Sequence, residues 1–220
     1  MIPTMGRVTW RIHHVHGDAA AFHAGDVVAE RSVTFVTVER PTLVLGSAQP
    51  DDAVDRHVAD ALGVEVVRRR SGGGAVLLLP DECVWADVVI PADDPLWDTD
   101  VARSMVWVGQ WWRRALPTTS SVHRGPLVSN EWSRQVCWAG VGTGEVLAPD
   151  GAKLVGISQR RTRESARFQT MCHLRSRPEL VAALVAAPRP TASVVASLTA
   201  VVATTAEHLT STLVDHLPAA

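Results

Sequence analysis

The stretch Arg68-Arg69-Arg70-Ser71-Gly72-Gly73-Gly74-Ala75-Val76 carries the strongest structural signal in the chain. Its three consecutive glycines stand between two apolar segments, 64–67 and 75–79, that are typical of strands. Glycine loses more conformational freedom on folding than any other residue, so such a run implies positive φ or a close approach to a ligand. Successive backbone N–H groups in such a turn can bind an anion, and arginines add bidentate phosphate donors. The stretch therefore predicts an anion- or nucleotide-binding turn, with a plain hairpin turn as the alternative.

The segments on either side of this turn alternate between strand-like and helix-like patterns. Apolar alternation predicts further strands at 33–39, 42–45, 84–90, 131–138, 145–148, 152–158 and 166–173. Apolar residues at helical spacing predict helices over 51–62 and 98–116, and prolines at first positions predict C-terminal helices over 178–187 and 190–217. The Pro-Asp-Gly sequence at 149–151 predicts a hairpin turn. Many strands with a few helices predict an α+β domain with a mixed sheet and flanking helices.

Composition and length fit a folded domain of average polarity. The 220 residues are 46% hydrophobic and 20% charged, with a net charge of −2, which excludes disorder and gives no general attraction to nucleic acid. No apolar run is long enough for a membrane span, and the N-terminus lacks the apolar core of a signal peptide. Three cysteines without a CxxC pair favour a cytoplasmic protein, and no ligand spacing predicts a metal site. A single domain over residues 1–220 is expected.

Lys153 is the only lysine in the chain, although Lys and Arg together number 21. Because an ammonium is a compact point charge that a guanidinium does not replace, the retained lysine suggests a function. An ordinary edge-strand lysine is the alternative. Gly156 follows three residues later, where a side chain would block a close approach. Strand alternation predicts that Lys153 lies on the face opposite Gly156 and Ser158.

Together, the two segments resemble motifs of the lipoate–protein ligase family. The family's RRxSGGGAV motif matches the arginine and glycine stretch, and its G-x-K-x-x-G-x-(S/A)-Q-R-R motif matches residues 151–161. The sequence PTLVLGSAQ at 41–49 also looks like the family's strand that ends in glycine and glutamine. The three segments occur in family order. The wider group includes biotin–protein ligases and cysteine-dependent octanoyltransferases.

The resemblance implies a catalytic domain like that of the biotin–protein ligases. Such a domain transfers a lipoyl or octanoyl group to a lysine of a lipoyl domain, by way of an acyl-adenylate made from lipoate or octanoate and ATP with magnesium. By motif position, Arg69 would contact the acyl-phosphate region and Lys153 the acyl carbonyl and phosphate. The other implied ligand-binding residues are Ser71, Gly72, Gly73, Gly74, Ala75, Gly156 and Ser158. The residues after 175 would suffice for two helices, expected from about residue 178, but not for the accessory domain of longer members.

One departure from the ligase pattern, together with the position of one cysteine, leaves the activation chemistry open. The ligases usually continue GGGAV with His-Asp and then Gly-Asn, whereas this chain has LLLPDE at 77–82. Cys137 precedes Lys153 at about the distance where cysteine-dependent octanoyltransferases place the thiol that accepts octanoate from acyl carrier protein. A small structural cysteine in a strand is the alternative for Cys137. The adenylate route is the preferred hypothesis, ahead of octanoyl transfer through Cys137 and of a non-catalytic acyl- or nucleotide-binding module.

Overall fold

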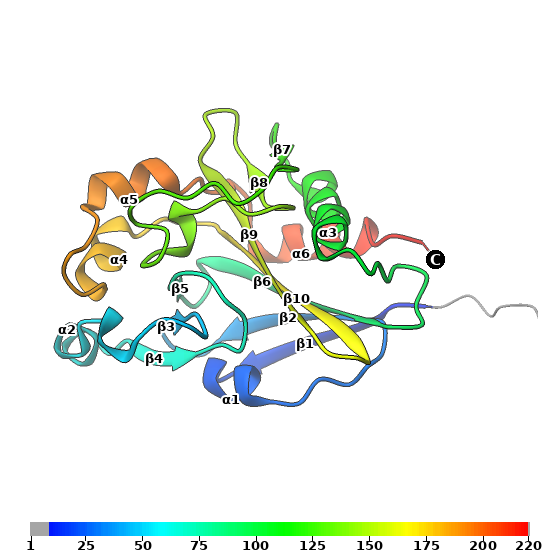
Figure 1. Cartoon of the computed structure of the whole chain (residues 1–220), viewed down its shortest axis with the longest axis horizontal. Helices are drawn as coiled ribbons and strands as arrows, with labels where there is room; N and C mark the ends of the chain where they lie inside the picture. The colour runs from blue at the N-terminus through cyan, green and yellow to red at the C-terminus, as the bar shows by residue number, and fades with distance from the viewer. Residues whose placement is uncertain (1–8, 220) are drawn as a thin grey trace, which may run out of the picture.

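A mixed sheet of seven strands forms the centre of the protein, which a computed structural model describes for residues 9–219 (Figure 1). The strand order is β1-β2-β6-β10-β9-β8-β7. These strands are β1 (Arg11–Gly17), β2 (Ser32–Val38), β6 (Cys83–Pro91), β7 (Ser121–Val122), β8 (Val146–Leu147), β9 (Lys153–Arg161) and β10 (Ser165–His173). Only the β1–β2 pair is parallel among these described strands. The predicted α+β class with a mixed sheet is confirmed.

The glycine turn belongs to a second, smaller sheet with the order β4-β3-β5. Its strands are β3 (Thr42–Leu45), β4 (Glu65–Arg68) and β5 (Val76–Leu78). β3 lies between the two strands that the turn connects, parallel to β4 and antiparallel to β5. The turn therefore crosses over β3, and the alternative of a plain hairpin turn is wrong.

Helices cover the sheets on both sides. They are α1 (Ala19–Ala24), α2 (Arg56–Ala61), α3 (Val101–Ala115), α4 (Pro178–Leu184), α5 (Ala192–Leu198) and α6 (Ala206–Asp215), with short 3-10 helices at Asp51–Ala53 and Cys137–Ala139. The predicted long helix is present as α3, capped by the Asp100 carboxylate on the Ala102 N–H at 2.8 Å. Within residues 9–219 no helix combines the length and apolarity that crossing a membrane requires.

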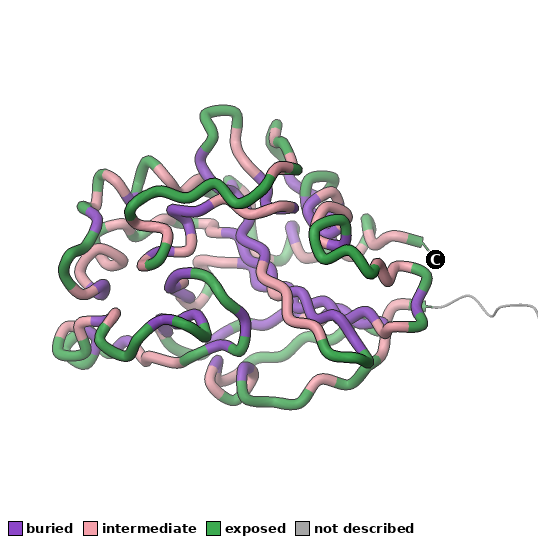
Figure 2. The backbone as a smooth tube through the Cα atoms, in the orientation of Figure 1, coloured by how far each residue is buried: buried purple, intermediate pink, exposed green. Residues whose placement is uncertain are grey.

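Apolar clusters of the core lie on both faces of the central sheet, and a further cluster lies between the smaller sheet, α2 and α4. One cluster packs α3 and α6 onto the sheet, with the Trp111 indole donating to the Leu213 carbonyl at 2.8 Å. A second cluster joins the central sheet to the smaller sheet and includes Trp85, Trp138 and Met171. Figure 2 shows the buried backbone concentrated along the central strands. The functional site described below lies on the second face.

Three predicted elements differ from the structure. The predicted helix 51–62 is divided, because the Asp55 carboxylate caps a new helix through the Val58 N–H. The predicted helix 190–217 is two helices, because the segment between them pairs with other strands, Thr199 with Lys153 and Val201 with His173.

The third difference concerns residues 131–138, which were predicted as a strand. They form a turn followed by the 3-10 helix Cys137–Ala139. The Asn130 carboxamide accepts from the Trp132 N–H at 2.9 Å, and the Ser133 hydroxyl accepts from the Asn130 N–H at 2.8 Å. Such local side-chain hydrogen bonds compete with strand pairing, so the prediction was wrong.

Candidate functional site

A cavity of about 420 Å³ is lined by residues of both sheets, α3 and the 3-10 helix that begins at Cys137. This volume lies within the range of small-molecule sites in proteins. The apolar residues of its wall are Val44, Val76, Leu78, Trp85, Val101, Met105, Leu127, Trp138, Ile157 and Met171. These walls suit an apolar chain, and the charged residues that line the cavity include Arg69, Glu145 and Lys153.

Most of the predicted site residues lie together at this cavity. Those that line it are Arg69, Gly72, Gly73, Gly74, Cys137, Lys153, Gly156 and Ser158. Ser71 lies behind the wall, where its hydroxyl is 3.0 Å from that of Ser158. Ala75 also stands back from the cavity and pairs with Val136. The structure thus brings together segments that are distant in sequence, while their roles in binding or catalysis stay predictions.

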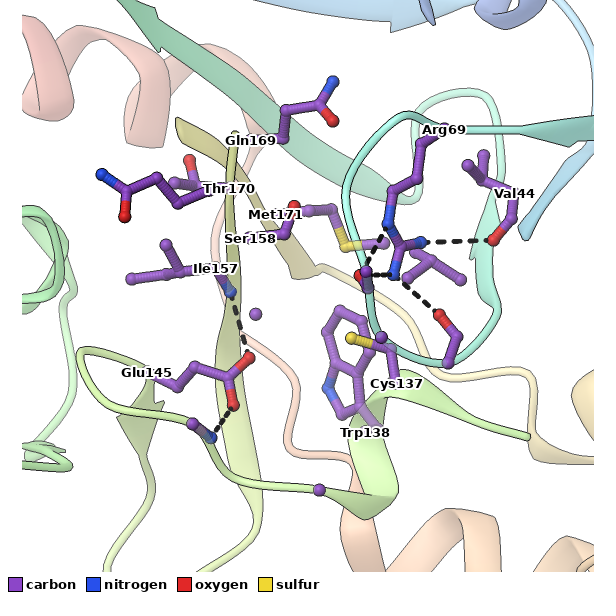
Figure 3. A pocket seen from close by; sticks show the side chains of 18 of the residues that line it. Val44, Arg69, Cys137, Trp138, Glu145, Ile157, Ser158, Gln169, Thr170 and Met171 are labelled. Atoms are coloured by element: carbon purple, nitrogen blue, oxygen red, sulfur yellow. Dashed lines mark hydrogen bonds between the residues drawn. The ribbon is translucent and has the colours of Figure 1, made fainter. Parts of the chain in front are cut away.

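Arg69 holds the glycine turn through hydrogen bonds from its guanidinium (Figure 3). Its guanidinium donates to the carbonyls of Gly72 at 2.8 Å, Gly74 at 2.9 Å and Val44 at 3.3 Å. The side chain is buried, and burial lowers the pKa of its guanidinium from the usual high value. Gly73 has φ +100°, which explains why glycine is needed there. These hydrogen bonds indicate that Arg69 stabilises the conformation of the turn.

The turn also lies tightly against the chain before Cys137. The Ala75 N–H donates to the Gln135 carbonyl at 2.8 Å, and the Cys137 N–H donates to the Ala75 carbonyl at 3.0 Å. A Cβ placed on Gly74 would stand 2.6 Å from the carbonyl carbon of Val136. At Gly74 the close approach is therefore to the protein's own backbone, whereas the sequence suggested a close approach to a ligand.

Lys153 and Glu145 form a buried ion pair at the cavity. The Lys153 Nζ lies 2.8 Å from the Glu145 Oε2 and donates to the Cys137 carbonyl at 2.7 Å. Glu145 in turn accepts from the backbone N–H groups of Gly142 at 2.7 Å and Ile157 at 3.1 Å (Figure 3). The single lysine is thus fixed between a carboxylate and the backbone of the candidate nucleophile.

The predicted face of Lys153 is wrong. Val146 pairs with Val155, but the next residue, Leu147, pairs with Lys153, so β9 has one extra residue at this point. Such a bulge reverses the alternation of side chains beyond it. As a result Lys153 lines the same cavity as Gly156, where uniform alternation placed the two on opposite faces.

Glu145 is a site residue that the sequence reasoning missed. It was treated only as the start of a predicted strand. The available signal was chemical: a lysine in a strand of apolar residues needs a counter-charge if it is buried. The hairpin at 149–151 returns the chain so that Glu145 can provide that charge.

The cysteines differ in their surroundings. Cys137 is half-buried, begins a 3-10 helix and lines the cavity. Cys83 and Cys172 do not line it, and burial raises the pKa of the Cys83 thiol to about 11 and that of the Cys172 thiol further. Low reactivity is expected of both thiols, because only the thiolate is nucleophilic.

A polar network that includes His23 forms another part of the wall. The Gln169 amide donates to Asp87 Oδ2 at 3.1 Å and to His23 Nδ1 at 3.2 Å, and the Ser71 hydroxyl donates to Gln169 Oε1 at 3.3 Å. Burial, aided by Arg167, lowers the pKa of His23 to about 3. The sequence reasoning did not single out His23, which stands in a short helix without a motif.

The burial of two histidines predicts that the fold loses stability in acid. His23, with a pKa near 3, and His173, lowered to about 4 by burial, bind fewer protons in the folded protein than in the unfolded chain. The free energy of unfolding should therefore fall as the pH drops from about 6.5 to 4. Asp87 works in the opposite sense. Burial raises its pKa from 3.8 to about 6, so its contribution to the free energy of unfolding is lost as the pH rises through about 6.

The His23→Phe variant should reduce the dependence on pH, since phenylalanine keeps the stacking on Trp85 but cannot take up a proton. Urea unfolding between pH 4 and 7 measures the slope. The control is His57→Gln, at an exposed position, which should leave the slope as in the wild type. An unchanged slope in His23→Phe would refute the assignment of the acid sensitivity to His23.

The chain belongs to the lipoyl protein ligase A/B catalytic domain family, whose sequence profile matches residues 20–217. It is therefore an acyl-transferring enzyme of this family, and the family resemblance is confirmed. A comparison with the sequences of curated proteins finds no match.

Solved structures of lipoate–protein ligases share its fold. The bipartite ligase of Thermoplasma acidophilum, from a study of that ligase and its E2 lipoyl domain, is 15% identical, with a TM-score of 0.71 over 94% of this chain and 81% of that one. A putative ligase of the same organism with bound lipoic acid is 14% identical, with a TM-score of 0.66 over 90% and 76%. A lipoate-protein ligase A bound with ATP is 16% identical, with a TM-score of 0.70 over 94% and 83%.

Proposed function

We propose that the protein transfers an eight-carbon acyl group, octanoyl or lipoyl, to a lysine of a lipoyl domain through a thioester on Cys137. The observation that carries this proposal is the position of Cys137 on the cavity wall, with its carbonyl 2.7 Å from the Lys153 Nζ. The expected strand around Cys137, which argued for a structural role, is absent. The thioester route therefore takes precedence over the adenylate route that the sequence favoured.

The cavity suits the acyl chain. Its apolar walls include Val44 and Val76 of the smaller sheet and Trp85 and Met171 of the central sheet. Each methylene that moves from water into such surroundings contributes about 0.8 kcal/mol. A chain bound there would place its carbonyl at Cys137, next to the Lys153–Glu145 ion pair.

The chemistry would proceed in two steps. In the first, the Cys137 thiolate attacks the carbonyl of an acyl thioester carried by acyl carrier protein; a new C–S bond forms and the carrier thiolate leaves. In the second, the neutral amine of the acceptor lysine attacks the Cys137 thioester, the amide forms, the Cys137 thiolate leaves, and the amine proton passes to solvent. A free catalytic thiol needs a reducing compartment such as the cytoplasm.

Lys153 would stabilise the negative charge on the carbonyl oxygen in both steps. An ammonium has three N–H donors, and two of them are engaged by Glu145 and the Cys137 carbonyl. The third has no acceptor among residues 9–219 and is available to the acyl oxygen. A fixed donor at a developing oxyanion, in a site shielded from water, is among the strongest catalytic devices.

Activation of lipoate or octanoate by ATP with magnesium is the second candidate. It is favoured by the glycine turn, where the N–H groups of Gly72 and Gly73 donate to no acceptor in the part of the chain that the structure describes. Such groups can bind a phosphate. Magnesium usually binds through the phosphates and few protein ligands, and residues 9–219 contain no cluster of three or more metal-ligating side chains. Cys137 has no role in this route.

Intact-mass measurement with a lipoyl domain as acceptor separates the routes. With octanoyl-acyl carrier protein, the enzyme should become about 126 Da heavier, for octanoyl in place of a proton. The adduct should be sensitive to neutral hydroxylamine, absent in Cys137→Ser and present in Cys83→Ser. Transfer with octanoate and ATP that Cys137→Ser leaves unchanged would replace the proposal with the ligase route. If neither donor modifies the acceptor, both proposed routes fail for this acceptor, and the alternative of an acyl- or nucleotide-binding module gains support.

A further inference from the structure

We propose that Glu145 is a positioning residue, which fixes the Lys153 ammonium beside Cys137 and so acts on acyl transfer through Lys153. The catalytic part of this inference rests on the proposed function. The structural part, that Glu145 holds the ammonium in one place, depends only on the contacts of the pair.

Glu145 is held so firmly that it can serve as a fixed point. Its Oε1 accepts from the Ile157 N–H and its Oε2 from the Gly142 N–H. These donors lie on two different segments, β9 and the loop before β8, so the carboxylate cannot rotate without breaking one of them. The side chain is 5% exposed, and that of Lys153 is 2% exposed. Water therefore competes little with either partner.

The position of Glu145 determines where the free N–H of Lys153 points. The donors of an ammonium are arranged tetrahedrally, so the direction of the third is set once two are engaged. Glu145 engages one and the Cys137 carbonyl another. Without Glu145, the ammonium would keep a single anchor and could rotate about it. Glu145 thus converts a mobile charge into an oriented donor.

The backbone of Lys153 is fixed as well. Its carbonyl accepts from the Trp138 indole at 3.0 Å and from the Ala200 N–H at 2.9 Å. The Trp138 ring lies 5.7 Å from the Nζ. Because these contacts hold the backbone of Lys153 independently of Glu145, Glu145→Gln, which keeps one oxygen for a backbone N–H, should change the ammonium more than the strand.

A role for Glu145 as the base that deprotonates the acceptor lysine fits the contacts less well. Its two oxygens accept from three donors, two of them backbone N–H groups and the third the Lys153 ammonium. Because both oxygens are already engaged, an approaching amine would have to displace one of these donors. Its contacts favour orientation over proton transfer.

The first test uses the fact that Lys153 is the only lysine. Protein labelled with [¹⁵N]lysine has a single side-chain ammonium signal, which is visible when the group is hydrogen-bonded and shielded from exchange with water. We expect the signal in the wild type and its loss or marked broadening in Glu145→Gln. The exposed Glu131→Gln is the matched control and should keep it. A signal of unchanged position and width in Glu145→Gln would overturn the inference.

The second test measures transfer. Glu145→Gln should lower kcat by up to about 10²-fold, the loss expected when a reacting group is misplaced by about 1 Å, with little change in KM for the acyl donor. Glu145→Asp should recover part of the loss. In a Lys153→Met background the same substitution should have no further effect, whereas a purely structural residue would lower activity in both. If wild-type protein transfers no acyl group, the proposed function fails, and the ammonium signal still decides the structural part.

Discussion

Replacing Lys153 with methionine should lower acyl transfer by about 10²–10³-fold, the loss seen when one preorganised donor to an oxyanion is removed. Methionine keeps much of the length of the side chain and supplies no N–H. The loss should appear in kcat for whichever donor supports the reaction, since both routes place the ammonium at the acyl carbonyl. Steady-state transfer to a lipoyl domain, followed by intact mass, measures it. Wild-type turnover in this variant would remove Lys153 from the mechanism.

The same substitution should also destabilise the fold. It leaves the Glu145 carboxylate buried without its cation, a change that typically costs about 3–5 kcal/mol. The double variant Lys153→Met/Glu145→Gln removes both charges and should recover most of that stability without recovering transfer. Urea unfolding of the two variants separates the effects. If the double variant regained activity, the loss in Lys153→Met would reflect unfolding and not catalysis.

Lys153→Arg is the informative conservative change. The space for the ammonium is defined by an oxygen at 2.8 Å and another at 2.7 Å. A guanidinium is planar and larger, so it cannot occupy that position with the same two contacts. We expect a folded protein with little transfer, which would show that position matters beyond charge.

The elements that the sequence predicted well have local patterns. The strands at 33–39, 84–90 and 166–173 and the helix at 98–116 appear as β2, β6, β10 and α3 with small changes at their ends. In each of these segments, the periodic spacing of apolar residues can be recognised within the segment itself. The segment 131–138 also alternates, but Asn130 and Ser133 bond to the nearby backbone, and this local chemistry prevents the strand.

The site could be predicted in its members but not in its arrangement. Arg69 stood out as part of a cluster of arginines and glycines, and Lys153 stood out as the only lysine in the sequence. The bulge in β9, which turns Lys153 toward Gly156, depends on how β8 pairs with β9, and no local pattern reports that pairing. Glu145 was missed for the same reason, because its contact with Lys153 exists only after the hairpin has formed.

Gly74→Ala should lower activity strongly by disturbing the protein's own backbone. An added Cβ would lie 2.6 Å from the Val136 carbonyl carbon and 2.7 Å from the Cys137 nitrogen, both backbone atoms that cannot move aside on their own. Overpacking of this kind costs about 1–3 kcal/mol. Because the Cys137 carbonyl also holds the Lys153 ammonium, the shift would separate nucleophile and donor, and a misplacement of about 1 Å can lower the rate by about 10²-fold.

Gly72→Ala is the matched control in the same turn. A Cβ at Gly72 meets no atom within 4 Å, and its φ lies outside the positive range that strains a side chain. If glycine is required at position 74 because the turn packs against residues 136 and 137, Gly72→Ala should keep its stability and its transfer, and Gly74→Ala should lower both. If the glycines serve instead for close approach to a ligand, the exposed Gly72 should be the sensitive position, with weaker binding of a non-hydrolysable acyl-adenylate by calorimetry and an unchanged unfolding free energy. Which of the two variants is more strongly impaired therefore decides whether the glycines serve packing within the protein or close approach to a ligand.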